Sequence, residues 1–337
     1  MSKGFTNLGN TCYMNSALQC LSHLELLNPN CKDLISDCKK RSSSNSIELM
    51  DQWISLQANM WNDGGNGVVN TMGILREFIK RCRNDNIYFE SFQQNDCGDF
   101  INTFLDLLHN SIKRKVTVEI IGKPKNKYDQ LKIKSIHSWK SFFEDSYSHI
   151  IKNFYSELLS VTCCSKCKYM TTNHEPIMNI TLTLKSTYDT IYDCLDEFVK
   201  EVTLDTGEEW KCDKCNKRVR PQKKITFWEL SPVLVLSVKQ YRLDRRSNID
   251  EKIDNHITFP EILDLNKYCL NLKNKDLKYK LSGICIHSGS LHGGHYYAMC
   301  KDFKKNQWRK HNDTHVSDTT IQEVLKETPY CFFYVRT

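Results

Sequence analysis

A cysteine near the start of the chain stands where a thiol could act as a nucleophile. Cys12 follows Thr11, which the sequence predicts as the N-cap of a helix over residues 11–25. The apolar stripe of this helix consists of Met14, Leu18, Leu21 and Leu24. The first turn of a helix offers free backbone N–H groups and the positive end of the helix dipole, and both lower the pKa of a thiol. Position alone suits a buried structural cysteine equally well, so the nucleophile hypothesis depends on finding a base.

A histidine that could be this base lies far downstream, in the run His292-Gly293-Gly294-His295-Tyr296-Tyr297. His295 follows two glycines at the predicted start of a strand, and glycines let a base approach a substrate backbone closely. Asn312 and Asp313 lie in a predicted turn, where either side chain could accept the second imidazole N–H and fix the tautomer. The histidines that could compete for the role are His287, His292, His311 and His315.

Four further cysteines form two Cys-x-x-Cys pairs, Cys164 with Cys167 and Cys212 with Cys215. Each pair can present two thiolates from one tight turn, and two such turns supply the sulfurs of a tetrahedral zinc site. Because four protein ligands fill such a site, the Zn²⁺ would be structural and not catalytic. A redox motif would need only one pair, and a zinc finger that reads nucleic acid is a second alternative. Cys163 could replace Cys164 only by breaking the two-residue spacing.

Composition and charge favour an intracellular protein. The 337 residues are 26% charged and 40% hydrophobic with a net charge of +7, which permits acidic partners without requiring nucleic acid. The N-terminus lacks the apolar core of a secretory signal, and the apolar runs are too short to cross a bilayer. We therefore expect a cytoplasmic or nuclear location, no membrane and no nucleic-acid partner. The 16 cysteines should then be reduced, with those outside Cys12 and the two pairs serving as core residues.

The order of the predicted elements favours an α+β fold. Further helices are predicted over residues 46–60, 71–83 and 96–109, and a turn-rich loop over 62–67. Lysine and arginine crowd residues 113–140, which we interpret as a solvated loop or exposed hairpin. Strands are predicted over residues 178–184, 232–238, 278–286, 295–300 and 330–335.

Several of these segments together resemble the ubiquitin-specific proteases, the papain-like deubiquitinases. Residues 4–21, from Gly4 to Leu21, are similar to the cysteine box of that family. Residues 94–101 are similar to its glutamine-rich box and residues 281–316 to its histidine box. The two cysteine pairs match its zinc knuckles, residues 232–241 match the strand after them, and residues 330–336 match the closing strand.

The resemblance implies a papain-like fold in a single catalytic domain over residues 1–337. A helical thumb would cover residues 1–110, zinc-bearing β fingers residues 150–230, and a β-rich palm with the histidine box residues 231–337. Two positions depart from the family pattern. Gly98 stands where a bulkier residue is usual, and Lys239-Gln240-Tyr241 replaces the usual Lys-Arg-Phe.

The resemblance also implies roles for individual residues. Cys12 would be the nucleophile, His295 the general base and Asn312 the third catalytic residue, with Asp313 in support. Asn7 would donate its side-chain N–H to the oxyanion beside the backbone N–H of Cys12. The residues implied to hold or line the path of the ubiquitin tail are Asp96, Asp99, Gly293 and Gly294.

The implied function is thiol-dependent hydrolysis of the bond after the C-terminal glycine of ubiquitin, with no catalytic cofactor and a monomeric enzyme. A protease for another ubiquitin-like modifier would share the fold and the nucleophile. A non-catalytic ubiquitin-binding scaffold would usually have lost Cys12 or His295, and both are present. A zinc-dependent nucleic-acid binder would leave the cysteine and histidine boxes unexplained.

Overall fold

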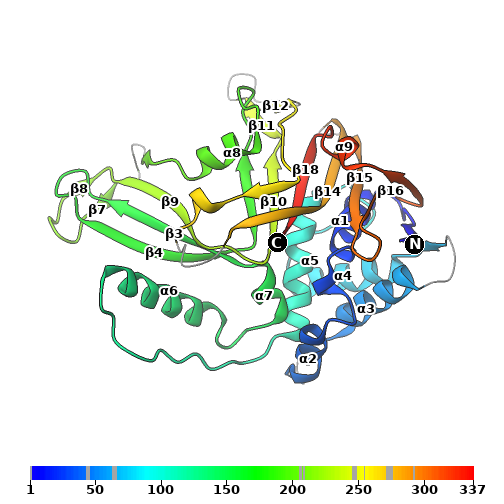
Figure 1. Ribbon diagram of the computed structural model, residues 1–337, viewed down its shortest axis with the longest axis horizontal. Helices are drawn as coiled ribbons and strands as arrows, with labels where there is room; N and C mark the ends of the chain where they lie inside the picture. The colour runs from blue at the N-terminus through cyan, green and yellow to red at the C-terminus, as the bar shows by residue number, and fades with distance from the viewer. Residues whose placement is uncertain are drawn as a thin grey trace.

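The computed structural model describes residues 2–42, 46–62, 67–204, 207, 209–244, 249–253, 255–270, 276–290 and 293–337. Helices dominate the N-terminal third and strands the remainder, so the predicted α+β class is confirmed. The helical part and a large sheet form one end of the molecule, and a narrower β arm extends from them (Figure 1). Within the described residues, no helix is both long and apolar enough to span a membrane.

The N-terminal helices surround one central helix. Helix α1 (Cys12–Ser22) is buried along its whole length, because helices cover one side and the large sheet covers the other. Its neighbours α3 (Glu48–Trp61), α4 (Met72–Asn84) and α5 (Cys97–Ile112) correspond to the predicted helices. Helix α2 (Lys32–Lys40), which packs on α5, was not predicted. Edge-to-face contacts of Tyr13 with Phe100 and of Trp53 with Phe104 join α1 and α3 to α5.

The large sheet lies directly behind α1. Its strand order is β17-β16-β15-β14-β18-β10-β5, with β13 also paired to β14. The strands are β5 (Asn179–Thr183), β10 (Val233–Lys239), β13 (Ile262–Asp264), β14 (Lys278–Ser290), β15 (Gly293–Asp302), β16 (Gln307–Asn312), β17 (His315–Thr319) and β18 (Pro329–Arg336). The predicted strands fall on five of these, β5, β10, β14, β15 and β18. Strand β5 pairs with β10 in this sheet although it falls within the range expected for the fingers.

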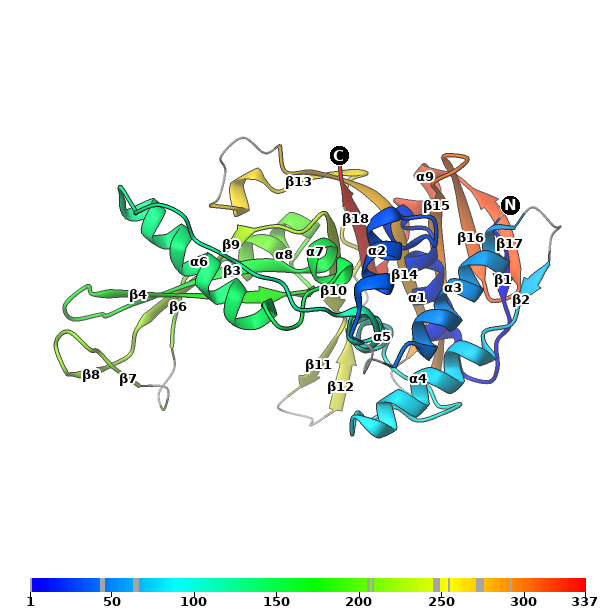
Figure 2. The same cartoon turned by 90° about the horizontal axis from the view of Figure 1, so that it is seen from below.

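The extended arm is a second sheet of order β4-β3-β9-β6. Its strands are β3 (Ser156–Cys163), β4 (Met170–Ile177), β6 (Val202–Thr203) and β9 (Gln222–Glu229), with the small hairpin of β7 (Trp210–Lys211) and β8 (Arg218–Val219) at its tip (Figure 2). The remaining elements are the pairs β1 (Gly4–Phe5) with β2 (Val68–Val69) and β11 (Tyr241–Asp244) with β12 (Ile249–Lys252), and the short helices α7 (His149–Phe154), α8 (Ile191–Phe198) and α9 (Ile321–Val324).

The basic segment contains a helix that was not predicted. Helix α6 (Lys127–Phe143) begins at the cap Asn126, whose side chain accepts the backbone N–H of Asp129. It lies along β4 (Figure 2), where Ser138 donates to the backbone carbonyl of His174 at 2.8 Å. The prediction of a loop or hairpin over residues 113–140 is therefore wrong for 127–140. In the sequence, the lysines spread around this helix obscure the pattern of the few apolar positions that face the arm.

The N-terminal strand β1 is held against the turn that joins β16 to β17. The backbone N–H of Phe5 donates to the carbonyl of Asp313 at 2.8 Å. Gly4 lies so close to this turn that a Cβ atom would stand 2.4 Å from the carbonyl oxygen of Thr314 and 2.6 Å from that of Asp313. Only glycine allows this approach, so Gly4 couples the N-terminus to the turn.

We expect Gly4→Ala to lower the free energy of unfolding by about 1–3 kcal/mol, because the methyl group must push the turn away. Gly67→Ala is the matched control, since a Cβ there would meet only the flexible Lys3 side chain at 4.0 Å. Denaturant unfolding of both variants measures the difference. Equal stability of Gly4→Ala and the wild type would contradict the close approach.

Candidate active site

The thiol of Cys12 lies where α1 meets β15. Cys12 is the first residue of α1 and is 5% exposed. Thr11 occupies the N-cap position, but its side chain does not cap the helix. Its hydroxyl accepts the backbone N–H of Leu8 at 2.9 Å and so braces the loop before Cys12. The thiol therefore sits on a fixed loop-to-helix junction beside the strand that carries His295.

The expected lowering of the Cys12 pKa is not found. Burial has the largest effect and raises the pKa of the thiol, and the negative charge of Asp313 acts in the same direction. Hydrogen bonds from the backbone of Tyr296 and from the first turn of α1 act against this rise but do not overcome it. The helix start lowers the pKa of Cys12 as predicted, but desolvation raises the pKa by more. This thiol therefore needs a base to remove its proton.

His295 on β15 and Asn312 on β16 form a hydrogen-bonded pair. Nε2 of His295 lies 2.6 Å from Oδ1 of Asn312, the last residue of β16. Because an amide oxygen only accepts, Nε2 carries the proton, and Nδ1 is the ring nitrogen left to exchange a proton with a thiol. The His295 side chain is 42% exposed, so the ring faces solvent where a substrate could enter.

Asp313 connects the β16–β17 turn to the segment around Cys12. Its carboxylate accepts the side-chain N–H groups of Asn7 at 2.9 Å and of Asn15 at 2.8 Å. The same carboxylate lies 3.9 Å from Nε2 of His295. The backbone of Asp313 is left-handed, with φ of 49°, a conformation that aspartate tolerates better than most residues. That turn aims the carboxylate of Asp313 at the N-terminal loop and the amide of Asn312 at the histidine.

Asn7 is held by both ends of its amide. Oδ1 accepts the backbone N–H groups of Gly9 at 3.0 Å and of Thr11 at 3.3 Å, while Nδ2 donates to Asp313. These contacts fix which end of the amide carries the hydrogens. The second Nδ2 hydrogen has no partner among the described residues, which leaves it available to an oxyanion beside Cys12.

Two of the four residues expected to contact the ubiquitin tail line a small cavity. The cavity measures about 210 Å³ and is lined by Tyr13, Gln94, Asn95, Asp96, His287, Gly294 and Tyr296. Asp96 also caps α5 by accepting the backbone N–H of Asp99 at 2.9 Å. Asp99 is exposed outside the cavity lining, and partial burial together with Asp96 raises the pKa of its carboxyl. Of the four predicted contacts, Asp96 and Gly294 line the cavity and Asp99 and Gly293 do not.

A glycine at position 294 is required by packing. A Cβ atom there would stand 2.2 Å from Nε2 of His287 and 2.7 Å from the carbonyl oxygen of Ser288. At Gly293 a Cβ would meet nothing within 4 Å. The two consecutive glycines therefore differ, and only Gly294 permits a close approach of neighbouring groups.

The competing histidines occupy other places. His311 is 1% exposed, and burial holds the pKa of its imidazole well below the usual range. His315 is exposed on β17, and His287 packs its ring on Tyr296 with centroids 4.5 Å apart. His292 lies outside the described residues. Among the described histidines, His295 is the one paired with Asn312.

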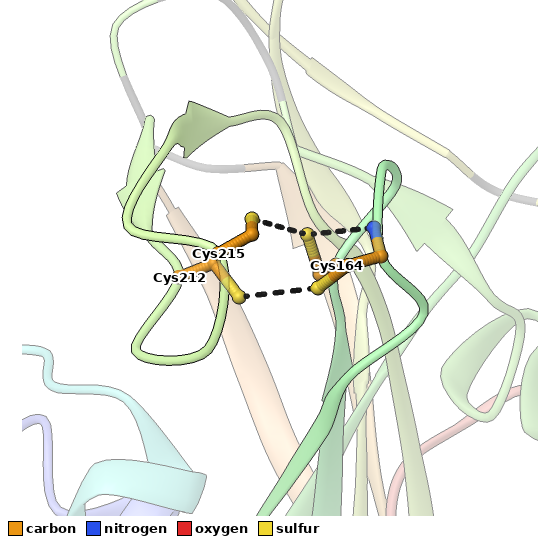
Figure 3. A group of neighbouring side chains, drawn as sticks. Cys164, Cys212 and Cys215 are labelled. Atoms are coloured by element: carbon orange, nitrogen blue, oxygen red, sulfur yellow. Dashed lines mark hydrogen bonds between the residues drawn. The ribbon is translucent and has the colours of Figure 1, made fainter.

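The two cysteine pairs come together at the tip of the arm (Figure 3). Sγ of Cys164 lies 3.8 Å from that of Cys215, Sγ of Cys167 lies 3.6 Å from that of Cys212, and all four are within 4.8 Å of one another. Four sulfurs at 2.3 Å from a central ion would be about 3.8 Å apart in a tetrahedron. The cluster could therefore hold a metal ion.

Both cysteine turns share one backbone design. The N–H of Cys164 donates to the carbonyl of Tyr169 at 2.8 Å, and the N–H of Cys212 donates to that of Lys217 at 3.0 Å. Each turn closes through a left-handed residue, Lys168 with φ of 57° or Asn216 with φ of 58°. The matching turns point both pairs at one centre, as the Cys-x-x-Cys spacing predicts.

Two contributors to the site were not predicted. Asn15 anchors Asp313, and its position three residues after Cys12 places both on one face of α1, a spacing that could have suggested it. The backbone of Tyr296 contacts the Cys12 thiol and lowers its pKa. A backbone contact cannot be recognised from the fact that residue 296 is a tyrosine.

Comparison with known proteins supports the assignment of the family. Residues 3–334 match the family model described as ubiquitin carboxyl-terminal hydrolase. Ubiquitin carboxyl-terminal hydrolase 2 of Bos taurus is 31% identical over 98% of this chain and 54% of its own length. The probable ubiquitin carboxyl-terminal hydrolase R319 of Acanthamoeba polyphaga mimivirus is 25% identical over 99% of this chain and 90% of its own length.

Solved structures show the same fold. The SAGA DUB module of Ubp8, Sgf11, Sus1 and Sgf73 bound to monoubiquitin matches with a TM-score of 0.76 and 25% identity, over 99% of this chain and 69% of that chain. The same module bound to ubiquitin aldehyde matches with a TM-score of 0.76 and 26% identity, over 99% and 69% of the two chains. The chain spans about half the length of the first curated relatives it matches, at 54% of the bovine protein. The match across residues 3–334 nevertheless shows that this chain belongs to the ubiquitin carboxyl-terminal hydrolase family.

Proposed function

We propose that this protein is a thiol-dependent deubiquitinase that hydrolyses the peptide or isopeptide bond after the C-terminal glycine of ubiquitin. The observation that carries the proposal is the 2.6 Å pairing of His295 Nε2 with Asn312 Oδ1, which frees Nδ1 to serve Cys12. Membership of the family across residues 3–334 supports it. The ubiquitin-bound Ubp8 modules share the fold and give the substrate class.

In the first half of the reaction, Cys12 attacks the carbonyl of the glycine. Because burial raises the pKa of Cys12, the thiol keeps its proton until Nδ1 of His295 removes it. Asn312 holds the imidazole with Nδ1 toward the thiol and stabilises the imidazolium that forms. The imidazolium then protonates the departing amine, which leaves ubiquitin joined to Cys12 as a thioester.

The developing oxyanion is stabilised by Asn7 and by the backbone N–H of Cys12. Asp313 and the loop amides fix the Asn7 carboxamide before substrate arrives, so no reorganisation is needed during the reaction. Loss of one such donor typically slows turnover about 100- to 1,000-fold. In the second half, His295 activates water against the thioester and returns the proton to Cys12.

The cavity beside Cys12 suits a substrate tail that ends in two glycines. Gly294 and Tyr296 line this cavity of about 210 Å³. Asp96 lines it as well and contributes negative charge, which suits a basic tail.

We infer that the cysteine cluster binds a structural Zn²⁺. Sulfur–sulfur distances of 3.6 and 3.8 Å match a tetrahedral thiolate site. Cys164 and Cys212 are fully buried, and burial of paired thiol groups is explained when they serve as metal ligands. Bound Zn²⁺ would cross-link the two turns at the tip of the arm, far from the catalytic residues.

The nearest alternative is a protease for another ubiquitin-like modifier, which would use the same Cys12 and His295. A non-catalytic ubiquitin-binding scaffold is less well supported, because Cys12 and His295 are both present and His295 is hydrogen-bonded to Asn312. The monomeric state and the cytoplasmic or nuclear location stay predictions.

We expect Cys12→Ala to abolish turnover of a ubiquitin conjugate while retaining ubiquitin binding, because the substitution removes only the nucleophilic sulfur. Calorimetric titration of this variant with ubiquitin checks binding, and a hydrolysis assay checks turnover. Absence of binding heat at every concentration, or residual turnover, would count against the proposal.

We expect His295→Ala to reduce kcat about 100- to 10,000-fold, because the general base is lost. Asn312→Ala should reduce kcat less, because Nδ1 remains and only its orientation suffers. His315→Ala, exposed opposite Asn312 on β17, is the control and should not change kcat. Equal or reversed losses for the first two variants would move the orienting role to Asp313.

Metal analysis of purified protein should find about one zinc ion per chain, and Cys164→Ser should lose it. Cys163→Ser is the matched control, because Cys163 is the preceding residue but lies outside the cluster, and it should retain zinc. Loss of zinc from both variants, or from neither, would contradict the assigned ligands.

A further inference from the structure

A row of buried thiols joins the helical part to the large sheet. Cys20 of α1 has its Sγ 3.5 Å from that of Cys285 on β14 and 3.6 Å from that of Cys300 on β15. The row continues with Cys97 on α5, whose thiol pKa is affected by its neighbours Cys285 and Cys331, the latter on β18. All five side chains are at most 1% exposed. Nothing in the proposed reaction uses these thiols.

The backbone leaves room for the sulfur of Cys20 at Gly283. Gly283 faces Cys300 in the β14–β15 ladder. A Cβ at Gly283 would stand 3.2 Å from Sγ of Cys20 and 3.6 Å from Sγ of Cys300. Cys20 can therefore lie between the two strands, in contact with a sulfur on each.

Cys300 differs from the other thiols because it has a histidine beside it. His23 is 1% exposed, and its Nδ1 donates to the carbonyl of Gln19 at 2.7 Å. Its Nε2 has no hydrogen-bond partner by distance and angle among the described residues. Burial opposes ionisation of both groups, but the attraction between Cys300 and His23 lowers the pKa of the thiol and raises that of the imidazole. The hydrogen bond between Cys300 and Cys20 also lowers the pKa of Cys300.

A cavity reaches this histidine from outside. It measures about 710 Å³, and His23 lies in its wall together with Leu24, Asp302 and Phe303. The His23 ring is held edge-on by Trp61 and His311, with centroids 5.0 and 4.9 Å away. A small polar oxidant that enters the cavity would meet His23 next to Cys300.

We propose that Cys300 and Cys20 form a peroxide-sensitive pair that closes to a disulfide, with His23 as the proton donor. The Cys300 thiolate attacks one oxygen of hydrogen peroxide, so that an S–O bond forms and the O–O bond breaks. His23 gives its proton to the departing hydroxide, which leaves as water. The thiol of Cys20 then attacks the sulfenic acid of Cys300, an S–S bond forms, and the second oxygen leaves as water with the proton of Cys20.

The disulfide would join the two elements that carry the candidate catalytic groups. Cys20 lies on α1, which begins at Cys12, and Cys300 lies on β15, which contains His295. Shortening of the sulfur separation from 3.6 Å to about 2.0 Å would shift α1 against β15 by on the order of 1 Å. This consequence for activity rests on the proposed function, but the disulfide itself does not.

The test uses the full chain with the Cys12→Ala substitution, so that the nucleophile cannot be oxidised. The folded, zinc-loaded protein is treated with hydrogen peroxide, alkylated, digested without reductant and examined by mass spectrometry. We expect a peptide pair linked through Cys20 and Cys300 that separates after reduction. His23→Gln should slow its formation at least tenfold, whereas Cys194→Ser, a buried thiol on α8 outside the row, should not.

A second variant tests the order of events. With Cys20→Ser, dimedone should label Cys300 as a trapped sulfenic acid, and thermal unfolding checks that the variant is folded. Linkage of Cys20 to Cys285 in place of Cys300 would overturn the proposal. So would a linkage rate that His23→Gln leaves unchanged, or no linkage at any peroxide concentration that leaves the protein folded.

Discussion

The carboxylate of Asp313 is the contact on which the candidate site depends most. It accepts from Asn7 and Asn15, and its pair with Asn15 joins positions 298 residues apart. Hydrogen bonds to a charged group contribute about 1.5–3 kcal/mol each, so the two together offset part of the cost of ordering the loops they join. The same turn holds Asn7 through the Asp313 carboxylate and holds His295 through Asn312. One turn therefore positions residues from both parts of the candidate site.

The β16–β17 turn can hold these residues in place only because α1 and the large sheet are rigidly packed. All of α1 is buried, with Cys12 at its N-terminal end and Cys20 near its C-terminal end. The first end meets the beginning of β15 at Tyr296, and the second meets the same strand at Cys300. The two elements that carry Cys12 and His295 are thus the same two that Cys20 and Cys300 join in the thiol row. A chemical change in the thiol row would therefore alter the position of α1, with Cys12, relative to β15, with His295.

Local patterns made much of this predictable. The Cys-x-x-Cys spacing is sufficient to predict each cysteine turn of the cluster, because each turn is fixed by residues within six positions of one another. Helices α1, α3, α4 and α5 follow from apolar periodicity, and β10 and β18 from short apolar runs. Cys12, His295 and Asn312 were identified through family motifs, and the structure brings His295 and Asn312 into contact.

What could not be predicted depends on tertiary packing. The pKa of Cys12 is raised by burial between α1 and β15, which no feature of its own helix reveals. Helix α6 was missed because its many lysines disguise a narrow apolar face that only β4 completes. The thiol row was interpreted as ordinary core, because its members come from five elements spread over more than 300 positions and only the fold brings their sulfurs together.

The central claim is that Cys12, His295 and Asn312 act together on ubiquitin. The most direct test measures fluorophore release from the C-terminus of ubiquitin and, in parallel, from the C-termini of other ubiquitin-like modifiers. We predict rapid release from ubiquitin and little from the others. Faster release from another modifier, or no release from ubiquitin by folded, zinc-loaded protein, would contradict it.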